Sequence, residues 1–186
     1  MADDAREKMV TGAVRLLATS GLEGVSFSTV LELTGAPRGS IYHHFPEGKS
    51  QLIELALERA RQYLLAAMET PPRSGAVQVA EHFFEIWRKV LLGSNFQAGC
   101  AVLAVTVATR EPALLKAARK VFLSWQDRLA QQLTRGGLRP DRAKMMAITM
   151  ITSVEGAVVL SRATQSSEPF ETTVAALLDQ IKGFVR

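Results

Sequence analysis

The sequence predicts an all-α protein. Apolar residues recur at helical intervals along the 186 residues, and no stretch shows the strict alternation of a half-buried strand between hairpin turns. Glycine and proline interrupt this pattern at the places where helices commonly end or begin. We therefore expect about nine helices, arranged as a small N-terminal domain over 1–48 and a larger helical domain over 49–186.

Three short helices are expected in the N-terminal domain. The first covers 4–19 and ends at Gly21. Ser26 is a suitable N-cap for the second, which ends at Gly35, and the third covers 38–44. This is the layout of a helix-turn-helix unit, in which the last short helix reads DNA.

Six further helices complete the predicted architecture. Pro112 and Pro140 lie near helix starts, and Gly136 marks a stop. The expected helices are 49–68, 75–92, 97–109, 112–135, 140–163 and 170–185.

Composition limits the class of protein. With 47% hydrophobic and 22% charged residues, 13 Gly and 7 Pro, the chain has the profile of a globular protein. Cys100 is the single cysteine, so no intrachain disulfide can form, and a reducing cytoplasm is expected. The N-terminus lacks the pattern of a signal peptide, and polar residues interrupt the uncharged stretch 90–109, so we expect a buried helix there and no membrane partner.

The charge balance favours an anionic partner without requiring one. Lys and Arg number 22 against 18 Asp and Glu, which gives +4 and a pI near 9.5. Residues 1–50, however, carry five basic and six acidic side chains. A DNA-binding surface in this part of the chain must therefore be local.

Residues 35–45 have the residue types of a DNA recognition helix. Gly35 allows a sharp turn, and Gly39 removes a side chain where a helix must approach DNA closely. Arg38 is the expected base reader, because a guanidinium can bond guanine O6 and N7 together. Ile41 and Phe45, four residues apart, are expected to face inward.

Polar residues around this helix are expected to contact phosphates. Lys49 begins the next helix, where its ammonium and the helix N-terminus can both meet a phosphate. The alternative for this segment is a surface hairpin with solvated polar residues, and Ser28 in particular could be merely solvated. The predicted DNA-binding set is Ser28, Thr29, Pro37, Arg38, Gly39, Ser40, Tyr42, His43, His44 and Lys49.

These residues resemble the TetR family of bacterial transcriptional regulators. The resemblance covers residues 21–52, with Gly-Leu-Glu-Gly-Val-Ser before the second helix and Gly-Ser-Ile-Tyr-His-His-Phe in the third. Three residues, 46–48, separate the phenylalanine from the lysine where the family usually has two. This variant, with the tripeptides 99–101 and 155–157, is similar to the subgroup of the lincomycin-resistance repressor (LmrA/YxaF-like). The resemblance implies a homodimer that blocks a promoter until a small molecule enters its C-terminal domain.

Aromatic and methionine side chains in the later helices suit a flat apolar effector. The alternative is that most of these side chains are core residues. Glu155 interrupts an uncharged run and could pair with a ligand, lie on the dimer interface or face solvent. The predicted ligand-binding set is Phe83, Trp87, Phe122, Trp125, Met146, Met150 and Glu155.

The last two helices carry more apolar positions than one short bundle needs, which favours a dimer interface of four helices. The predicted interface residues are Ile151, Val158, Val174, Leu177, Leu178 and Ile181.

No catalytic motif is present in the sequence, so we expect a protein that is not an enzyme. We predict neither a cofactor nor a metal site, because His43, His44, His82 and Cys100 lack metal-ligand spacing. The leading hypothesis is a ligand-responsive repressor of double-stranded operator DNA. The alternatives are a small-molecule-binding helical dimer with weak or lost DNA binding, and a transcriptional activator.

Overall fold

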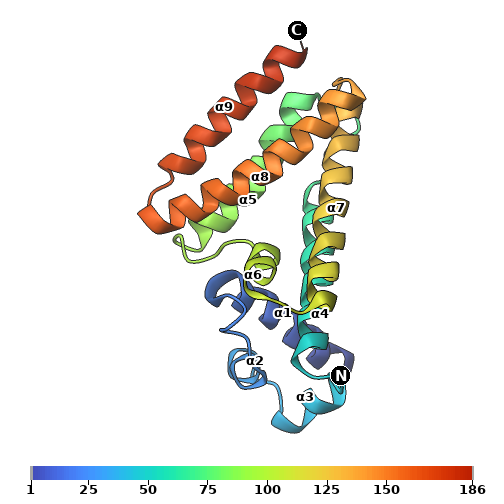
Figure 1. Ribbon diagram of the computed structural model, residues 1–186, viewed down its shortest axis with the longest axis vertical. Helices are drawn as coiled ribbons and strands as arrows, with labels where there is room; N and C mark the ends of the chain where they lie inside the picture. The colour runs from blue at the N-terminus through green and yellow to red at the C-terminus, as the bar shows by residue number, and fades with distance from the viewer. Residues whose placement is uncertain (1, 186) are drawn as a thin grey trace. The chain divides into compact units, whose positions relative to one another are not determined.

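The computed structural model describes residues 2–185, and within them it contains nine helices and no strand (Figure 1). The predicted all-α fold is confirmed. The helices are α1 (Ala2–Ser20), α2 (Phe27–Thr34), α3 (Arg38–His44), α4 (Lys49–Ala67), α5 (Ala76–Gly93), α6 (Ala101–Ala108), α7 (Pro112–Arg135), α8 (Pro140–Thr164) and α9 (Glu168–Val185).

The chain forms two compact units whose boundaries differ from the expected domains 1–48 and 49–186. The first unit contains the residues up to Tyr63 and Cys100–Phe122, and the second contains Leu64–Gly99 and the residues from Leu123 onward. Helices α4 and α7 each contribute residues to both units, because the boundaries after Tyr63 and after Phe122 fall inside these helices.

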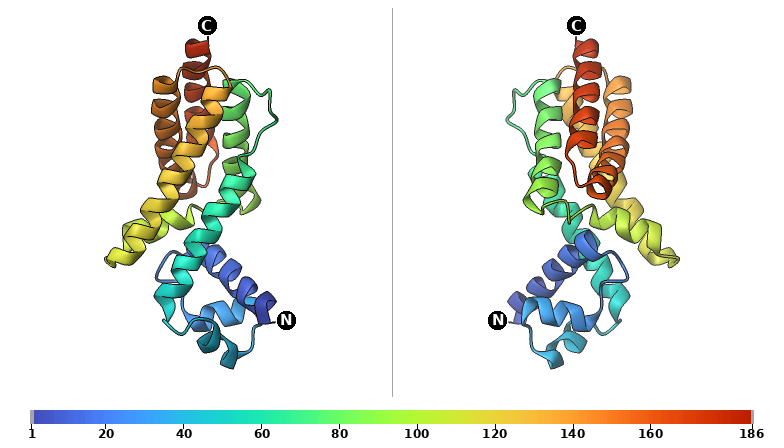
Figure 2. Two further views of the ribbon diagram at one scale, coloured as in Figure 1. Left: turned by 90° about the vertical axis from the view of Figure 1, so that its right-hand side faces the viewer. Right: turned by 90° about the vertical axis from the view of Figure 1, so that its left-hand side faces the viewer.

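In the first unit, α1, α2 and α3 lie around the beginning of α4 (Figure 2). Their shared core includes Met9, Ala13 and Val30, which are fully buried. Gly21 and Gly35 follow α1 and α2 with φ of 71° and 67°, a left-handed conformation that ends a helix at little cost for glycine. Both predicted helix ends are therefore confirmed.

Helix α6 begins later than the expected residue 97. Asn95 and Phe96, with φ of 50° and 62°, follow the end of α5, and Cys100 is still extended with φ of −82° and ψ of 118°. The Cys100 sulfur then accepts a hydrogen bond from the Leu103 N–H at 3.4 Å and caps the helix at Ala101. Neither feature produces a periodic sequence signal.

The second unit is built on α5, α8 and α9, which contact one another pairwise. The chain approaches itself closely where α5 begins, because the Ala76 N–H donates to the Gly136 carbonyl at 2.8 Å. A Cβ atom on Gly136 would lie 2.5 Å from the Ala76 nitrogen. Glycine is required at this contact, and the stop predicted there is confirmed.

An ion pair joins α5 to α9 in the second unit. The Arg88 guanidinium donates from Nε and Nη2 to the two carboxylate oxygens of Glu171, each at 2.7 Å, and also donates to Glu85. These hydrogen bonds hold the pKa of Glu171 below its ordinary value of 4.5, against the opposing effect of burial. Arg88 also lies over the ring of the buried Phe170, 5.7 Å from its centroid.

Helix α8 is long and apolar enough to cross a membrane by length and composition alone. Half of its most apolar window is buried inside the molecule, which is typical of a core helix. Met146, Met150 and Val154 are each at most 1% exposed and form part of this core.

Candidate DNA-binding surface

A capping box fixes the start of α2. The Ser26 hydroxyl accepts from the Thr29 N–H at 3.1 Å, and the Thr29 hydroxyl accepts from the Ser26 N–H at 2.8 Å. The Thr29 hydroxyl also lies 3.0 Å from the Gly24 carbonyl. Thr29 is therefore engaged in capping, whereas its neighbour Ser28 is exposed.

Two buried residues determine which face of α3 points outward. Ile41 and Phe45 are 0% and 1% exposed, so both face inward as predicted. Because they lie on one side of a helix, Tyr42 and His43 between them face solvent, and His44 is half-buried. The left-handed Gly35 allows the turn that carries the chain from α2 into α3.

The outward face of α3 combines a cation, hydrogen-bonding groups and a gap. Arg38, Tyr42 and His43 are exposed, with Tyr42 67% exposed. A Cβ atom on Gly39 would meet nothing within 4 Å, so its backbone lies open to an approaching surface. No acidic side chain occurs in α3. The local charge therefore suits an anionic partner despite the acidic balance of residues 1–50.

Tyr42 is held by an aromatic contact that the sequence analysis missed. Its ring lies edge-on to the Phe27 ring with centroids 5.4 Å apart, and Phe27 in turn lies 6.4 Å from Phe45. This contact fixes the phenol while leaving its hydroxyl in solvent. Phe27 is the first residue of α2, and no periodic pattern marks it as a partner of α3.

Two of the predicted phosphate contacts also hold the backbone in place. The Ser40 hydroxyl donates to the Pro37 carbonyl at 2.7 Å, and its lone pairs stay available as acceptors. The Lys49 ammonium donates to the Leu22 carbonyl at 3.2 Å, which ties the start of α4 to the beginning of the loop after α1. An ammonium has three donors, so Lys49 retains two for a phosphate.

The structure thus gathers the predicted DNA-binding set in one unit, on α2, α3 and the start of α4. The exposed members are Ser28, Pro37, Arg38, Gly39, Tyr42, His43 and Lys49, and the half-buried members are Thr29, Ser40 and His44. Across the part of the chain that is described, no three His, Cys, Asp or Glu side chains come together as metal ligands. The chemistry of this surface is hydrogen bonding and charge.

Most of the predicted ligand-binding residues lie in the second unit. The members of the predicted set that are buried in this unit are Phe83, Trp87, Trp125, Met146, Met150 and Glu155. Phe122 is half-buried and belongs to the first unit. The Trp87 indole N–H and the Gln132 side-chain oxygen are buried without a hydrogen-bond partner among the described residues. Gln132 was not in the predicted set, because a glutamine within an amphipathic helix gives no burial signal.

The predicted dimer residues are mostly buried within one chain. Ile151, Val158, Val174, Leu177 and Ile181 are at most 6% exposed, and Leu178 is half-buried. They pack where α8, α9 and α5 contact one another, so the extra apolar positions stabilise the unit itself.

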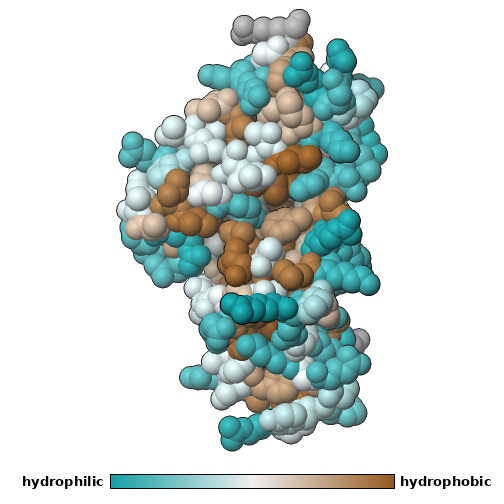
Figure 3. Space-filling view, in the orientation of Figure 1, coloured by the Kyte–Doolittle hydropathy of each residue, from teal (hydrophilic) through white to brown (hydrophobic). Residues whose placement is uncertain are grey.

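A different face of α8 carries exposed apolar side chains. Figure 3 shows apolar side chains among polar ones over this helix. Ile148 and Val159, three turns apart, are 41% and 48% exposed, and Leu160 is 58% exposed. Gly156 lies between them, and a Cβ there would meet nothing within 4 Å. On α8, the exposed apolar residues therefore lie beside the predicted interface residues, which are buried.

Comparison with known proteins decides the family. Residues 10–56 match the model of the bacterial regulatory proteins of the tetR family, and residues 76–176 match the C-terminal domain of the LmrA/YxaF-like transcriptional regulators. The chain belongs to the TetR family. The family and subgroup predicted from the sequence are therefore confirmed, and the protein is a transcriptional regulator and not an enzyme.

Relatives of known sequence and structure extend over nearly the whole chain. An uncharacterized HTH-type transcriptional regulator of Mycobacterium tuberculosis is 33% identical over 174 residues, covering 89% of this chain and 88% of that protein. LmrA of Bacillus subtilis is 24% identical, and the match covers 96% of this chain and 97% of LmrA. A TetR regulatory protein of Rhodobacter sphaeroides superposes with a TM-score of 0.83 at 20% identity, covering 94% and 97%. A TetR-family regulator of Cytophaga hutchinsonii has a TM-score of 0.76 at 26% identity, covering 98% and 96%.

Proposed function

We propose that this TetR-family regulator is a cytoplasmic, ligand-responsive repressor that binds a pseudo-palindromic operator as a homodimer. The observation that carries this proposal is the outward face of α3, where Arg38, Tyr42 and His43 are exposed around the open backbone of Gly39. A helix of this kind fits the major groove. Two copies related by a twofold axis would read half-sites about 34–36 Å apart, or a multiple of one DNA turn.

Within this proposal the side chains have separate roles. Arg38 reads a base, because its guanidinium is exposed and has the geometry to bond guanine bidentately. Tyr42, His43, Ser28 and Lys49 contact phosphates, which position the helix without reading sequence. Thr29 supports them indirectly, since its hydroxyl maintains the α2 cap.

The dimer interface is proposed on the exposed face of α8. Ile148, Val159 and Leu160 supply apolar area, and Gly156 allows a partner helix to approach closely. The interface residues expected from the sequence then form the core beneath α8 and support its exposed face. The partner is a second copy of this chain, because a symmetric dimer buries the same face twice.

The effector is proposed to bind within the second unit as a flat aromatic molecule with polar groups. Buried polar atoms normally have hydrogen-bond partners. An effector that offers an acceptor to the Trp87 N–H and a donor to the Gln132 oxygen would satisfy both atoms. To release DNA it must bind the conformation that does not bind DNA more tightly than the one that does.

Selection of duplexes from a random pool tests the proposed function. The purified full chain should enrich a pseudo-palindromic sequence, and an effector should release the selected DNA. A pool that stays unenriched with folded, dimeric protein would instead favour a small-molecule-binding dimer that has lost its DNA contacts.

A further inference from the structure

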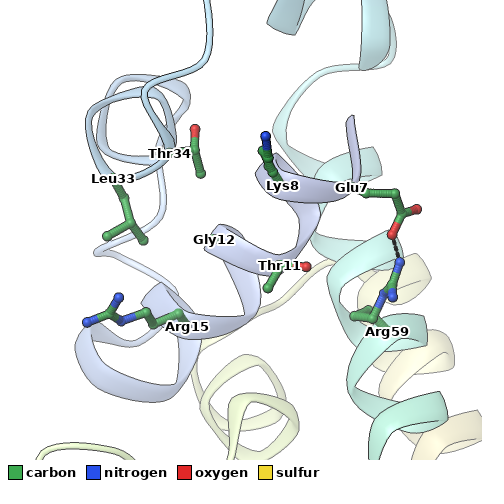
Figure 4. Close-up of a pocket in the computed structure, with 8 residues that line it drawn as sticks. All are labelled: Glu7, Lys8, Thr11, Gly12, Arg15, Leu33, Thr34 and Arg59. Carbon is green, nitrogen blue, oxygen red and sulfur yellow. Dashed lines mark ion pairs between the residues drawn. The ribbon is translucent and has the colours of Figure 1, made fainter. Parts of the chain in front are cut away.

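A pocket of ligand size lies on the first unit between α1, the end of α2 and α4 (Figure 4). Its volume is about 440 Å³, within the range of small-molecule sites. No residue of α3 lines it. The pocket is therefore separate from the surface assigned above to the DNA and from the core of the second unit.

The floor of the pocket is formed where α1 and α2 lie close together. A Cβ atom on Gly12 would lie 2.6 Å from the Thr34 methyl carbon, so a larger residue would push the two helices apart. Leu33, 39% exposed, forms an apolar wall beside this floor. Gly12 is itself buried beneath the Thr34 methyl group, so a small apolar body can rest against the Leu33 and Thr34 side chains.

The rim of the pocket carries more positive than negative charge. Three cations, Lys8, Arg15 and Arg59, line it with one acid, Glu7. Arg59 forms an ion pair with Glu7, and Lys8 forms one with Asp4 at 2.7 Å.

Arg15 differs from the other two cations. It is exposed, and no acidic side chain among the described residues forms an ion pair with its guanidinium. Figure 4 shows it on α1 on the same side as Leu33. A guanidinium binds a carboxylate through two parallel hydrogen bonds, which makes it the natural anchor for an anionic ligand.

We propose that this pocket binds a small organic carboxylate, with the carboxylate on Arg15 and the apolar body against Leu33 and Thr34. The ligand would join α1 to the last turn of α2, directly before the Gly35 turn into α3. The DNA-binding unit thus has a small-molecule site of its own, in addition to the effector site proposed in the second unit. Occupancy of this site does not depend on the repressor function.

Nuclear magnetic resonance on the full chain, with labelled leucine methyl groups and glycine amides, tests the site. The probes are benzoate, benzyl alcohol as the ring without a charge, and inorganic phosphate as an anion without an apolar body. Benzoate should shift the Leu33 methyl and Gly12 amide signals to saturation, and the other two should not saturate them over the same concentrations. Unmoved signals with benzoate, or equal saturation by phosphate, would overturn the proposal.

Two matched variants then test the role of Arg15. Arg15→Gln should weaken benzoate binding at these signals at least tenfold, because it removes the bidentate partner. Arg119→Gln removes the same charge from an exposed position on α7 in the same unit and should leave the affinity unchanged. Equal loss in both variants would mean that general charge attraction, and not this pocket, holds the probe.

Discussion

Arg38 and Lys49 are both exposed cations of the proposed DNA surface, but their positions give them different roles. Arg38 begins α3, and Lys49 begins α4, where its ammonium is tied to the Leu22 carbonyl. We predict that Arg38→Ala costs about 1–3 kcal/mol at one base position and relaxes specificity there. Lys49→Ala should weaken binding to all sequences and reduce the salt slope by about one.

Titration of operator variants that differ at single base pairs measures both effects. Equal losses on every duplex after Arg38→Ala would assign that residue to the phosphates.

Gly136 is a residue whose replacement the fold should not tolerate. An alanine Cβ would lie 2.5 Å from the backbone nitrogen of Ala76, and backbone cannot move aside cheaply. We predict that Gly136→Ala lowers the free energy of unfolding by about 1–3 kcal/mol, as overpacking typically does. Gly183→Ala is the matched control, because its Cβ would meet nothing within 4 Å in α9, and it should raise stability by about 0.5–1 kcal/mol. Urea unfolding of both variants measures the difference.

Among the helices, the attachment of α9 to α5 depends on pH through Glu171. Hydrogen bonds from Arg88 place the folded-state pKa of Glu171 below the ordinary 4.5. The ion pair therefore stabilises the fold fully above pH about 4.5, and this stability is lost as the pH falls through the lowered pKa. Because the Glu171 side chain is 42% exposed, water screens the pair, and we expect only about 0.5–1 kcal/mol from it.

We predict that Glu171→Gln is less stable than the wild type at pH 7 and that the difference shrinks in acid. Glu168→Gln removes a charge from the same first turn of α9 and controls for the helix dipole. Thermal unfolding of the three proteins across pH 3–7 is the measurement. A difference between Glu171→Gln and wild type that is constant across this range would exclude the ion pair as its cause.

Helix ends were predictable where the chain uses glycine or a side-chain cap, and less so elsewhere. Gly35 and Ser26 carry such local signals, and both ends of α2 follow them. The start of α6 depends on the extended Cys100, whose sulfur accepts from the Leu103 N–H, and a cysteine is not among the usual side-chain caps. Likewise, periodicity showed that α8 has apolar positions, but only packing against α5 and α9 decides which of them remain exposed.

At the scale of the whole molecule, the proposed dimer rests on the exposed face of α8. We predict that Val159→Lys, which places a charge between Ile148 and Leu160 on this face, converts the dimer to a folded monomer. Leu92→Lys is the control, since Leu92 is 47% exposed and belongs to α5 instead of α8. Sedimentation velocity distinguishes the two species. A dimeric Val159→Lys would place the interface elsewhere.

The candidate site could be predicted from the sequence largely because α3 concentrates unusual residues in a short segment. The exposure of Tyr42 and His43 follows from the burial of Ile41 and Phe45, whereas Arg38 is exposed at the first position of α3. The support of Tyr42 by Phe27 and the pocket around Gly12 could not be predicted, since both depend on how separate helices meet. Residue types indicate the chemistry of a surface, whereas the contacts that hold its side chains in place depend on how the helices pack.

Fluorescence anisotropy of the full chain with DNA flanking its own gene tests whether α3 gives sequence-specific operator binding. We predict a strong preference for this DNA over a scrambled duplex of equal length and composition. We also predict an affinity that falls steeply as salt rises, because phosphate contacts release counterions. Equal, salt-sensitive binding to both duplexes, in a protein that also enriches no sequence from a random pool, would contradict specific recognition by α3.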